Sequence, residues 1–521
     1  MGFLNKINQK GYKRMVIGHH KVDDSEIENQ KKTPFLEAVK EYLATNPTSF
    51  DVPGHKFGHF KTDLEDYLGD SVYKFDVNAP LGLDNLSRPR GVIKESEDIF
   101  AKAIGADYCL YQINGTTGAI HTMILGCLRP KDKIILPRNV HKSIVNSLIL
   151  SGAVPIFVYP DIDPHTGIAN GVSLKEYERA IKDNPDAKAV LVINPTYFGV
   201  TSNIEAIAEL AHKNNMIAMA DEAHGTHFYF SSKLPKGALE AGFDISASSM
   251  HKTGGSLTQS SVIIIKGKRV DVDRVKTVAG MMSSTSPNST LMASIESARK
   301  RMFFEGEELI SKVIDLVNYA RTEVNNIPGL KAIDRTYING DSRFGLDETK
   351  LVVDVSGLGI TGFDVYREMR YKYNVQLELG EYCDCLAVFA VGTSKEDVDK
   401  LIEAYKGISK EHYGKKDKKQ MPTFSFRFPE LVTRPRVAFS APSKVVSCAE
   451  AIGEISAESV MIYPPGIPVV IPGEIITKEI VDMITFYKEN NGVILNDAPD
   501  GMMKIIDRKH WFLKSDLDYD F

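Results

Sequence analysis

The sequence predicts an α/β protein built on a mainly parallel sheet, followed by a smaller α/β domain and a C-terminal α+β domain. Three observations lead to this prediction. The chain has 521 residues, which is too long for one hydrophobic core. From about residue 90 to 270, short apolar runs alternate with amphipathic stretches, as strands joined by crossover helices do. A second, shorter alternation runs from about 310 to 410.

Four segments follow from this pattern. An N-terminal arm covers residues 1–85, a large domain 86–305, a small α/β domain 306–420 and a C-terminal domain 421–521. The arm is charged at first, and the glycine- and histidine-rich stretch FDVPGHKFGHF (50–60) then indicates irregular structure. The basic stretch KKDKKQ (415–420) is typical of a solvated linker between the last two domains.

Six strands are predicted in the large domain, because each is a short apolar run between turn-forming residues. They are KIILP (133–137), VPIFV (154–158), KAVLVI (188–193), MIAMAD (216–221), DISASSM (244–250) and SVIIIK (261–266). Amphipathic stretches such as NIEAIAELAHKNN (203–215) lie between them and predict helices. In a parallel sheet of this kind, ligands bind at the C-terminal ends of the strands.

The small domain repeats the alternation with fewer elements. It reads helix, strand, helix, strand and helix, in the segments 308–326, 350–356, 363–373, 386–392 and 395–409. The C-terminal domain contains the Pro- and Gly-rich stretch YPPGIPVVIPGE (463–474).

Charge and composition argue against several classes of protein. With 68 acidic and 63 basic residues the net charge is −5, which does not favour a nucleic-acid-binding protein. No run of about 20 apolar residues occurs, so no membrane span is expected. The N-terminal stretch is polar and lacks the apolar core of a signal peptide. The five cysteines show no disulfide or zinc spacing, which favours reduced thiols and a cytoplasmic location.

Two predicted strands end in side chains that can take part in catalysis or in binding a cofactor. MIAMAD ends at Asp221, which Ala223 and His224 follow closely. DISASSM contains Ser249 and is followed by His251 and Lys252, a lysine among small and hydroxylated residues. A lysine in such surroundings is suited to bond covalently to a carbonyl group.

A third motif precedes a predicted helix. QINGTTGAIH (112–121) places Gly115, Thr116 and Thr117 where backbone N–H groups and the helix dipole favour a phosphate. The motif lacks the GxxxxGK[ST] pattern, which argues against a nucleotide P-loop.

A phosphate-binding site, a carboxylate and an amine are together the groups that a protein needs to bind pyridoxal 5'-phosphate (PLP). Its aldehyde bonds to a lysine, its ring nitrogen needs a carboxylate to stay protonated, and its phosphate needs hydrogen-bond donors. Asp221 is suited to the second task, because an ion pair raises the pKa of the ring nitrogen. The short spacing of Asp221, His224 and His227 also occurs in metal sites, but no further His or Cys is suitably placed and no metal is predicted.

These motifs belong to a larger set. The chain resembles the ornithine/lysine/arginine decarboxylases, which have the aspartate-aminotransferase fold (fold type I of the PLP-dependent transferases). The resemblance covers nearly the whole length of the chain. Within the family, the chain is most similar to the short members that lack an N-terminal wing, such as biosynthetic arginine decarboxylases. It rests on FDVPGHK (50–56), LDNLSRPRG (83–91), NGTTGAIH (114–121), RNVHKS (138–143), DEAHGTH (221–227), SMHKTGGSLTQ (249–259), STSPN (284–288) and YPPGIPVVIPGE (463–474).

The resemblance implies a role for each matching residue. Lys252 would hold the PLP aldehyde, Asp221 the ring nitrogen, and His141 and Ala223 the two ring faces, while His224 would contact the phenolic oxygen. The phosphate would be held by Gly115, Thr116, Thr117, Ser249 and His251.

Three further residues complete the implied site. Thr285 and Ser286 would reach the PLP site of a second subunit, which implies a homodimer; assembly beyond the dimer is left open. Glu474 would receive the cationic end of the substrate. The stretch EYCDC (381–385) departs from the relatives and has no assigned role.

The resemblance therefore implies decarboxylation of a basic amino acid, with L-arginine giving agmatine and carbon dioxide at the entry to polyamine synthesis. Lysine giving cadaverine, and ornithine, are the alternative substrates. A fold-type-I aminotransferase and a non-catalytic PLP-binding protein are the alternative functions.

Overall fold

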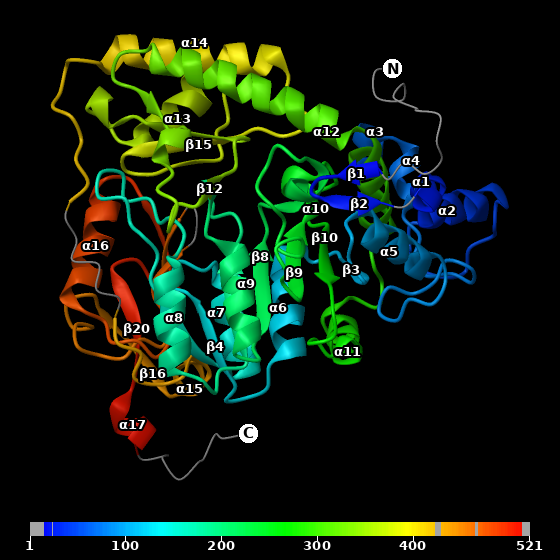
Figure 1. The fold of residues 1–521 in the computed structure, drawn as a ribbon, viewed down its shortest axis with the longest axis horizontal. Coiled ribbons are helices and arrows are strands. Elements are labelled where there is room, and N and C mark those ends of the chain that lie inside the picture. Colours follow the sequence, from blue (N-terminus) through cyan, green and yellow to red (C-terminus); the bar gives the residue numbers. More distant parts are fainter. Residues whose placement is uncertain (1–14, 23, 423–428, 464–466, 513–521) are drawn as a thin grey trace.

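The computed structural model describes residues 15–22, 24–422, 429–463 and 467–512. Figure 1 shows the large domain at the centre, the small domain above it in green to yellow, the C-terminal domain on the left in orange to red, and the N-terminal arm on the right in blue. The arrangement confirms the predicted α/β fold with a mainly parallel central sheet.

The central sheet has seven strands in the order β3-β10-β9-β8-β6-β4-β5. Their bounds are β3 Tyr108–Gln112, β4 Lys133–Pro137, β5 Val154–Val158, β6 Ala189–Ile193, β8 Ile217–Glu222, β9 Ile245–Ser249 and β10 Ser261–Ile265. The six predicted strands therefore coincide with β4, β5, β6, β8, β9 and β10 to within one residue, whereas β3 was not anticipated.

Strand β10 is antiparallel to both of its neighbours, and the other pairings in the sheet are parallel. The chain between β9 and β10 holds the short helix α10 (Met250–Thr253) and a turn, which is too little for the crossover that a parallel pair needs. The resulting register sets Ser261 opposite both Ser249 and Gln112. Two hydroxyls from neighbouring strands thus meet at one edge of the sheet.

Helices cover both faces of the sheet. Two of the helices, α6 (Gly115–Cys127) and α7 (Lys142–Ser151), pack with Ile134 and Leu136 of β4. On the other face, α8 (Leu174–Asp183) and α9 (Ile204–Lys213) pack in one core with Ile135. Alternate residues of β4 thus enter different cores, which explains why the strand reads as an unbroken apolar run.

A single long helix, α12 (Ser289–Asn325), joins the large and small domains and runs without a break through residues 305 and 306. Its N-terminal part packs in the core of the arm, and its C-terminal part in the core of the small domain. The small sheet, in the order β11-β13-β15-β14, is antiparallel throughout. Its elements are β11 Lys331–Ala332, β13 Lys350–Asp354, β14 Leu379–Gly380, β15 Asp384–Val388, α13 Gly362–Lys372 and α14 Lys395–His412.

The C-terminal domain contains two small antiparallel sheets, β16-β20 and β18-β17-β19. Its elements are α15 Pro435–Ser440, β16 Ser443–Ser447, β17 Val460–Tyr463, β18 Ile467–Val470, α16 Lys478–Glu489, β19 Val493–Leu495, β20 Met502–Ile506 and α17 Arg508–Phe512. The guanidinium of Arg436 holds this domain to α7 through a 2.7 Å bond from Nε to the carbonyl oxygen of Ile149.

The arm and the connecting segments supply the remaining elements. They are β1 Met15–Ile17, β2 His20–Val22, α1 Asp24–Gln30, α2 Pro34–Ala44, α3 Asp63–Leu68, α4 Asp70–Phe75, α5 Val92–Ala103, β7 Val200–Thr201, α11 Val272–Met282 and β12 Gly345–Leu346, with 3-10 turns at Thr226–Phe230, Arg335–Tyr337 and Ser356–Leu358. Among the described helices, none has the length and apolar character needed to cross a membrane.

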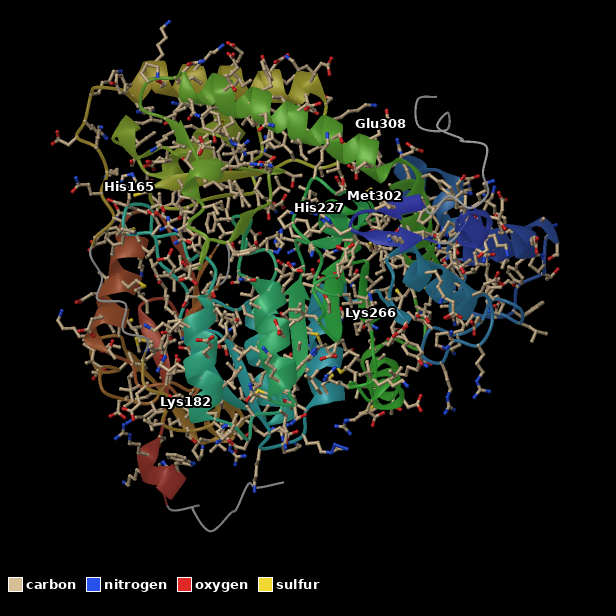
Figure 2. The ribbon with its side chains drawn as sticks, viewed as in Figure 1. His165, Lys182, His227, Lys266, Met302 and Glu308 are labelled. Atoms are coloured by element: carbon tan, nitrogen blue, oxygen red, sulfur yellow. The ribbon has the colours of Figure 1, made fainter. Side chains whose placement is uncertain are left out.

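The large and small domains meet at a buried polar seam. His227 lies deep in the molecule, between the central sheet and the small domain (Figure 2). Its Nε2 is 3.2 Å from Oδ1 of Asp347 and 3.1 Å from Oγ1 of Thr349. These contacts place β13, which begins at Lys350, beside the C-terminal ends of the central strands.

Candidate active site

A cavity of about 440 Å³ opens at the C-terminal edge of the central sheet. Its size is within the range of sites for small ligands and cofactors. The structure brings the following residues of the sequence-predicted site to its wall: Gly115, Thr116, Thr117, His141, Asp221, Ala223, His224, Ser249, His251 and Lys252. They gather there because β8 and β9 are parallel neighbours and end at the same edge.

Lys252 follows β9 on the short helix α10, and its side chain is partly buried in the cavity wall. Its Nζ lies 3.0 Å from Nε2 of His224 and 5.7 Å from the ring centroid of Tyr197. Burial lowers the pKa of Lys252, against the opposing effect of the negative charges of Asp221 and Glu378. A larger share of uncharged amine is therefore present than at an exposed lysine, and this is the nucleophilic form.

Asp221 is buried near the end of β8, and its Oδ1 accepts a 3.1 Å hydrogen bond from the N–H of Ala223. No described residue forms an ion pair with this carboxylate. Burial raises its pKa, although the Ala223 N–H and the charge of Lys252 act in the opposite direction. A buried acid without a counter-ion is stabilised in its ionised form when a cation enters the cavity.

His141 caps the N-terminus of α7 at the end of β4. Its Nδ1 accepts a 3.2 Å hydrogen bond from the N–H of Ser143, which fixes the orientation of the ring. Burial, together with the charge of Lys252, lowers the pKa of His141 to about 4. The imidazole is therefore neutral near pH 7 and offers a flat, uncharged face to the cavity.

The N-terminus of α6 forms another wall of the cavity. Gly115 has a positive φ of 63°, which glycine adopts without strain, and the helix begins there. The Oγ1 of Thr116 is 2.8 Å from Oγ of Ser261 and also bonds to Ser249. Nδ1 of His251 bonds at 2.8 Å to the carbonyl oxygen of Ser260. Hydroxyls and a helix N-terminus together make an anion-binding surface.

Sequence reasoning missed three polar residues at this site. Nζ of Lys350 lies 3.0 Å from Nδ1 of His224, and the ring of Tyr197 lies 4.5 Å from that of His224. The hydroxyl of Tyr197 donates a hydrogen bond to Glu378. Burial lowers the pKa of Lys350 to about 8. A lysine at the start of the apolar strand KLVVDVS was the available signal, because lysine is rarely fully buried.

Thr285 and Ser286 do not line this cavity. They lie exposed between α11 and α12, and Ser286 borders a separate hollow with Val52, Pro53 and Asp76. Their expected action on a second subunit stays a prediction.

Glu474 is also absent from the cavity wall, and its expected contact with the cationic end of a substrate stays a prediction. Its carboxylate is buried against the guanidinium of Arg138, with distances of 3.0 Å from Nε to Oε1 and 2.8 Å from Nη2 to Oε2. It also accepts a 2.8 Å hydrogen bond from the N–H of Ile471. A buried, bidentate pair of this kind leaves the carboxylate already neutralised. It joins the C-terminal domain to the end of β4.

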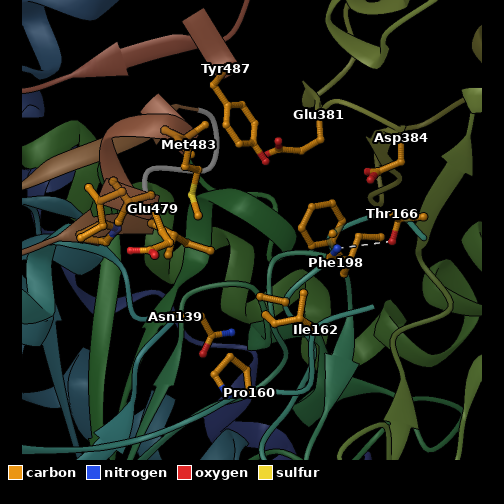
Figure 3. Close-up of a pocket in the computed structure, with 18 of the residues that line it drawn as sticks. Asn139, Pro160, Ile162, Thr166, Phe198, Glu381, Asp384, Glu479, Met483 and Tyr487 are labelled. Atoms are coloured by element: carbon orange, nitrogen blue, oxygen red, sulfur yellow. Dashed lines mark hydrogen bonds between the residues drawn. The ribbon is translucent and has the colours of Figure 1, made fainter. Parts of the chain in front are cut away.

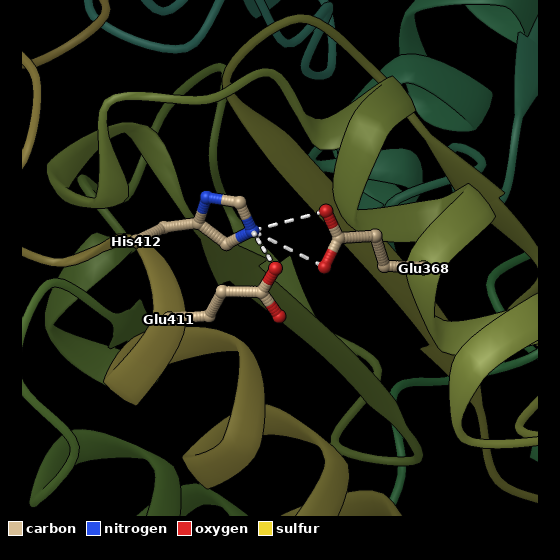
Figure 4. A group of neighbouring side chains, drawn as sticks. All are labelled: Glu368, Glu411 and His412. Atoms are coloured by element: carbon tan, nitrogen blue, oxygen red, sulfur yellow. Dashed lines mark hydrogen bonds and ion pairs between the residues drawn. The ribbon is translucent and has the colours of Figure 1, made fainter.

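The group of described residues best placed to hold a metal ion lies elsewhere, in the small domain. It consists of Glu368, Glu411 and His412 (Figure 4). Nζ of Lys372 is 3.1 Å from Glu368 and 2.9 Å from Glu411, so a cation already neutralises both carboxylates.

Comparison with known proteins places the chain in a family. Residues 33–396 match the model of the Orn/Lys/Arg decarboxylase major domain, and residues 418–494 match the model of the C-terminal domain of the same family. A protein named arginine decarboxylase from Bacillus subtilis is 40% identical over 481 residues, which are 92% of this chain and 98% of the relative. One of the same name from Halalkalibacterium halodurans is 39% identical over 89% of this chain and 94% of the relative.

Solved structures agree in fold. Lysine decarboxylase A from Pseudomonas aeruginosa has a TM-score of 0.78 and 21% identity, covering 92% of this chain and 81% of that one. At this identity the likeness concerns the fold. The two family models and the relatives at about 40% identity carry the assignment further: this chain belongs to the Orn/Lys/Arg decarboxylase family.

Proposed function

We propose that this protein is a PLP-dependent decarboxylase that converts L-arginine to agmatine and carbon dioxide. The observation that carries the proposal is the juxtaposition of Lys252 and Asp221 in one cavity beside the N-terminus of α6. The choice of arginine rests on the relatives of that name at about 40% identity, since a lysine decarboxylase from Pseudomonas aeruginosa is 24% identical.

The residues of the cavity fit PLP. Asp221, buried without an ion-pair partner among the described residues, suits the protonated ring nitrogen, and Lys252 suits the aldehyde. Thr116, Thr117 and Ser249 offer donors for the phosphate at the N-terminus of α6, and the neutral ring of His141 suits an aromatic face. When bound, PLP supplies the electron sink that accepts the bonding electrons of the departing carboxylate.

The remaining tasks fall to the side chains of this chain. After carbon dioxide leaves, a proton must reach the α-carbon. The pKa of His141 is lowered to about 4, so its imidazole is neutral near pH 7 and is a poor proton donor. The amine of Lys252, which lines the same cavity, is the group that we propose to hold and deliver this proton.

Two further features belong to the proposal. A homodimer would allow Thr285 and Ser286, exposed in the loop before α12, to reach the cavity of the second subunit. A cytoplasmic location agrees with the five cysteines, none of which forms a disulfide in the structure, which describes all five positions.

The decisive experiment supplies arginine, lysine and ornithine separately to the PLP-loaded protein and measures carbon dioxide and the amine formed. Agmatine as the dominant product supports the proposal. Cadaverine would keep the mechanism and replace arginine with lysine. Lys252→Ala is the control and should release no carbon dioxide. A PLP-loaded protein that releases none from any of the three substrates would overturn the decarboxylase assignment.

A further inference from the structure

A second cavity, of about 130 Å³, lies where the large, small and C-terminal domains meet. It adjoins the candidate active site, because Asn139, Ala169, Phe198 and Ile467 line both, but Lys252 and Asp221 are absent from its wall. Figure 3 shows side chains from all three domains turned towards its interior. Two of them, Glu381 and Asp384, belong to the stretch EYCDC, which the active site leaves unused.

Asp384 is the central observation. It is the first residue of β15 and is 0% exposed. Both of its carboxylate oxygens are buried without a hydrogen-bond partner among the described residues. A buried carboxyl group in this state is costly unless a partner enters from outside. Its place in the cavity wall shows where that partner would bind.

Glu381 stands beside Asp384 on the same turn, with its N–H bonded at 2.7 Å to the carbonyl oxygen of Asp384. Its carboxyl group also points into the cavity (Figure 3). Burial, followed by the charge of Asp384, raises the pKa of Glu381 well above its ordinary value. Burial, followed by Asp354 and Asp163, does the same for the pKa of Asp384.

The nearby charges do not neutralise the pair. Asp354 and Asp163 are themselves acidic, and the ring of His165 is paired with Asp354 at 2.7 Å. The ammonium of Lys419 lies over the ring of Tyr382, 5.9 Å from its centroid. This end of the cavity is therefore acidic.

The rest of the cavity is mainly apolar. Ile162, Ile168, Phe198, Met483 and Tyr487 contribute side chains to its wall. A third carboxylate, Glu479 in the first turn of α16, lines the side opposite Glu381 and Asp384 (Figure 3). Acidic groups thus flank an apolar middle.

We propose that this cavity binds a dicationic alkane, with an ammonium or guanidinium group at each end of a methylene chain. One cationic end bonds to Glu381 and Asp384, the methylene chain packs against the apolar wall, and the other end faces Glu479. Charge-assisted bonds to a buried carboxylate and contact of methylene groups with apolar side chains both favour this class of ligand. Amines produced from basic amino acids belong to it, but binding itself requires no turnover.

The test titrates the PLP-loaded protein with 1,4-diaminobutane, using calorimetry and visible absorption in parallel. Binding in the candidate active site alters the absorption of the bound cofactor, whereas binding in the second cavity produces heat alone. We expect both events. Butane-1,4-diol, of the same length but uncharged, should produce neither. Should the protein fail to hold PLP, the heat assigned to the second cavity is still measurable, so the two proposals fail separately.

Asp384→Asn, which keeps the shape of the side chain, should weaken the event that leaves the absorption unchanged by about tenfold or more. Glu381→Gln should weaken it as well and serves as the second variant if Asp384→Asn unfolds. Asp500→Asn is the matched control, because Asp500 is exposed and pairs with Lys488. Binding should also release protons in the wild type, seen as a heat that depends on the buffer, and less so in Asp384→Asn.

Two results would overturn the proposal. One is a titration with a single binding event, whose heat and absorption change occur over the same range of ligand concentration. The other is a second event that persists with unchanged affinity in both Asp384→Asn and Glu381→Gln.

Discussion

Lys252 and Lys350 bond to opposite nitrogens of one imidazole, since each Nζ lies 3.0 Å from a different ring nitrogen of His224. Burial, followed by the charges of the two lysines, lowers the pKa of His224 well below its usual range, so the ring is neutral. A neutral imidazole has one donor and one acceptor nitrogen. When both contacts are hydrogen bonds, one of the two amines is therefore uncharged and accepts.

This arrangement makes Lys350 a positioning residue for His224 and, through it, for Lys252. We expect Lys350→Met to lower kcat by up to about a hundredfold, because a small displacement of the reacting amine is costly. Loss of the positive charge should also raise the pKa of His224, which NMR titration of the ring measures. Lys331→Met, at an exposed position on β11, is the control. Unchanged kcat and an unchanged titration of His224 would contradict this role.

The negative charge of Asp221 should be required for decarboxylation. Asp221→Asn keeps the volume of the side chain but cannot stabilise a protonated ring nitrogen. We expect kcat for carbon dioxide release to fall by about a hundredfold or more. Asp221→Glu, which retains the carboxylate, should keep more activity. Equal activity of the Asn variant and the wild type would exclude the ion pair with the cofactor.

The ion pair between Arg138 and Glu474 should stabilise the junction with the C-terminal domain. Arg138→Met leaves the carboxylate of Glu474 buried and unpaired, which typically costs about 3–5 kcal/mol. Adding Glu474→Gln should restore part of this loss, because the unpaired charge is then gone. Urea unfolding of the single and double variants measures both effects. A large rise in KM for Glu474→Gln without any loss of stability would instead return Glu474 to the substrate site.

Stability should fall with rising pH because of Glu97. Burial raises the pKa of Glu97 from 4.5 to about 8, against the 2.9 Å hydrogen bond donated by the N–H of Tyr111. Above pH 4.5 the unfolded chain releases this proton while the folded protein keeps it. The contribution of Glu97 to the free energy of unfolding is therefore complete below about pH 4.5. It falls by about 1.4 kcal/mol per pH unit above that and is lost by about pH 8.

Glu97→Gln should flatten this dependence, because glutamine does not titrate and still offers an oxygen to Tyr111. The measurement is the free energy of unfolding in urea between pH 5 and pH 9. Glu308→Gln, at an exposed position on α12, should leave the slope as it is in the wild type. An identical slope in Glu97→Gln and the wild type would assign the pH dependence to other groups.

The shared active site can be tested by mixing variants. Lys252→Ala should be inactive. Ser286→Glu should be impaired, since the new carboxylate would repel the phosphate group of the PLP that is bound in the partner subunit. A mixed dimer of the two contains one site with both intact residues. Random mixing should restore about a quarter of the wild-type activity. No recovery in verified mixed dimers would place Ser286 outside the partner's site.

Much of the fold was within reach of the sequence. β4 and β5 coincide with their predicted runs, and β4 is a continuous apolar segment because it is buried on both faces. The convergence of Asp221 and Lys252 was predictable as well, since parallel strands that are sheet neighbours end at the same edge. The local pattern around Gly115 indicated a phosphate site, whereas the place of His141 in the cavity followed from the family resemblance.

Tertiary structure alone decided the contacts between distant segments. Lys350 meets His224 across 126 positions of the sequence, and Arg138 meets Glu474 across 336. The burial of Asp384 depends on packing among three domains. Local patterns determine which segments become strands and which side chains stand at their ends, because these follow from short-range periodicity. Which charged groups then face one another depends on how the domains dock, and no short stretch of the sequence encodes that geometry.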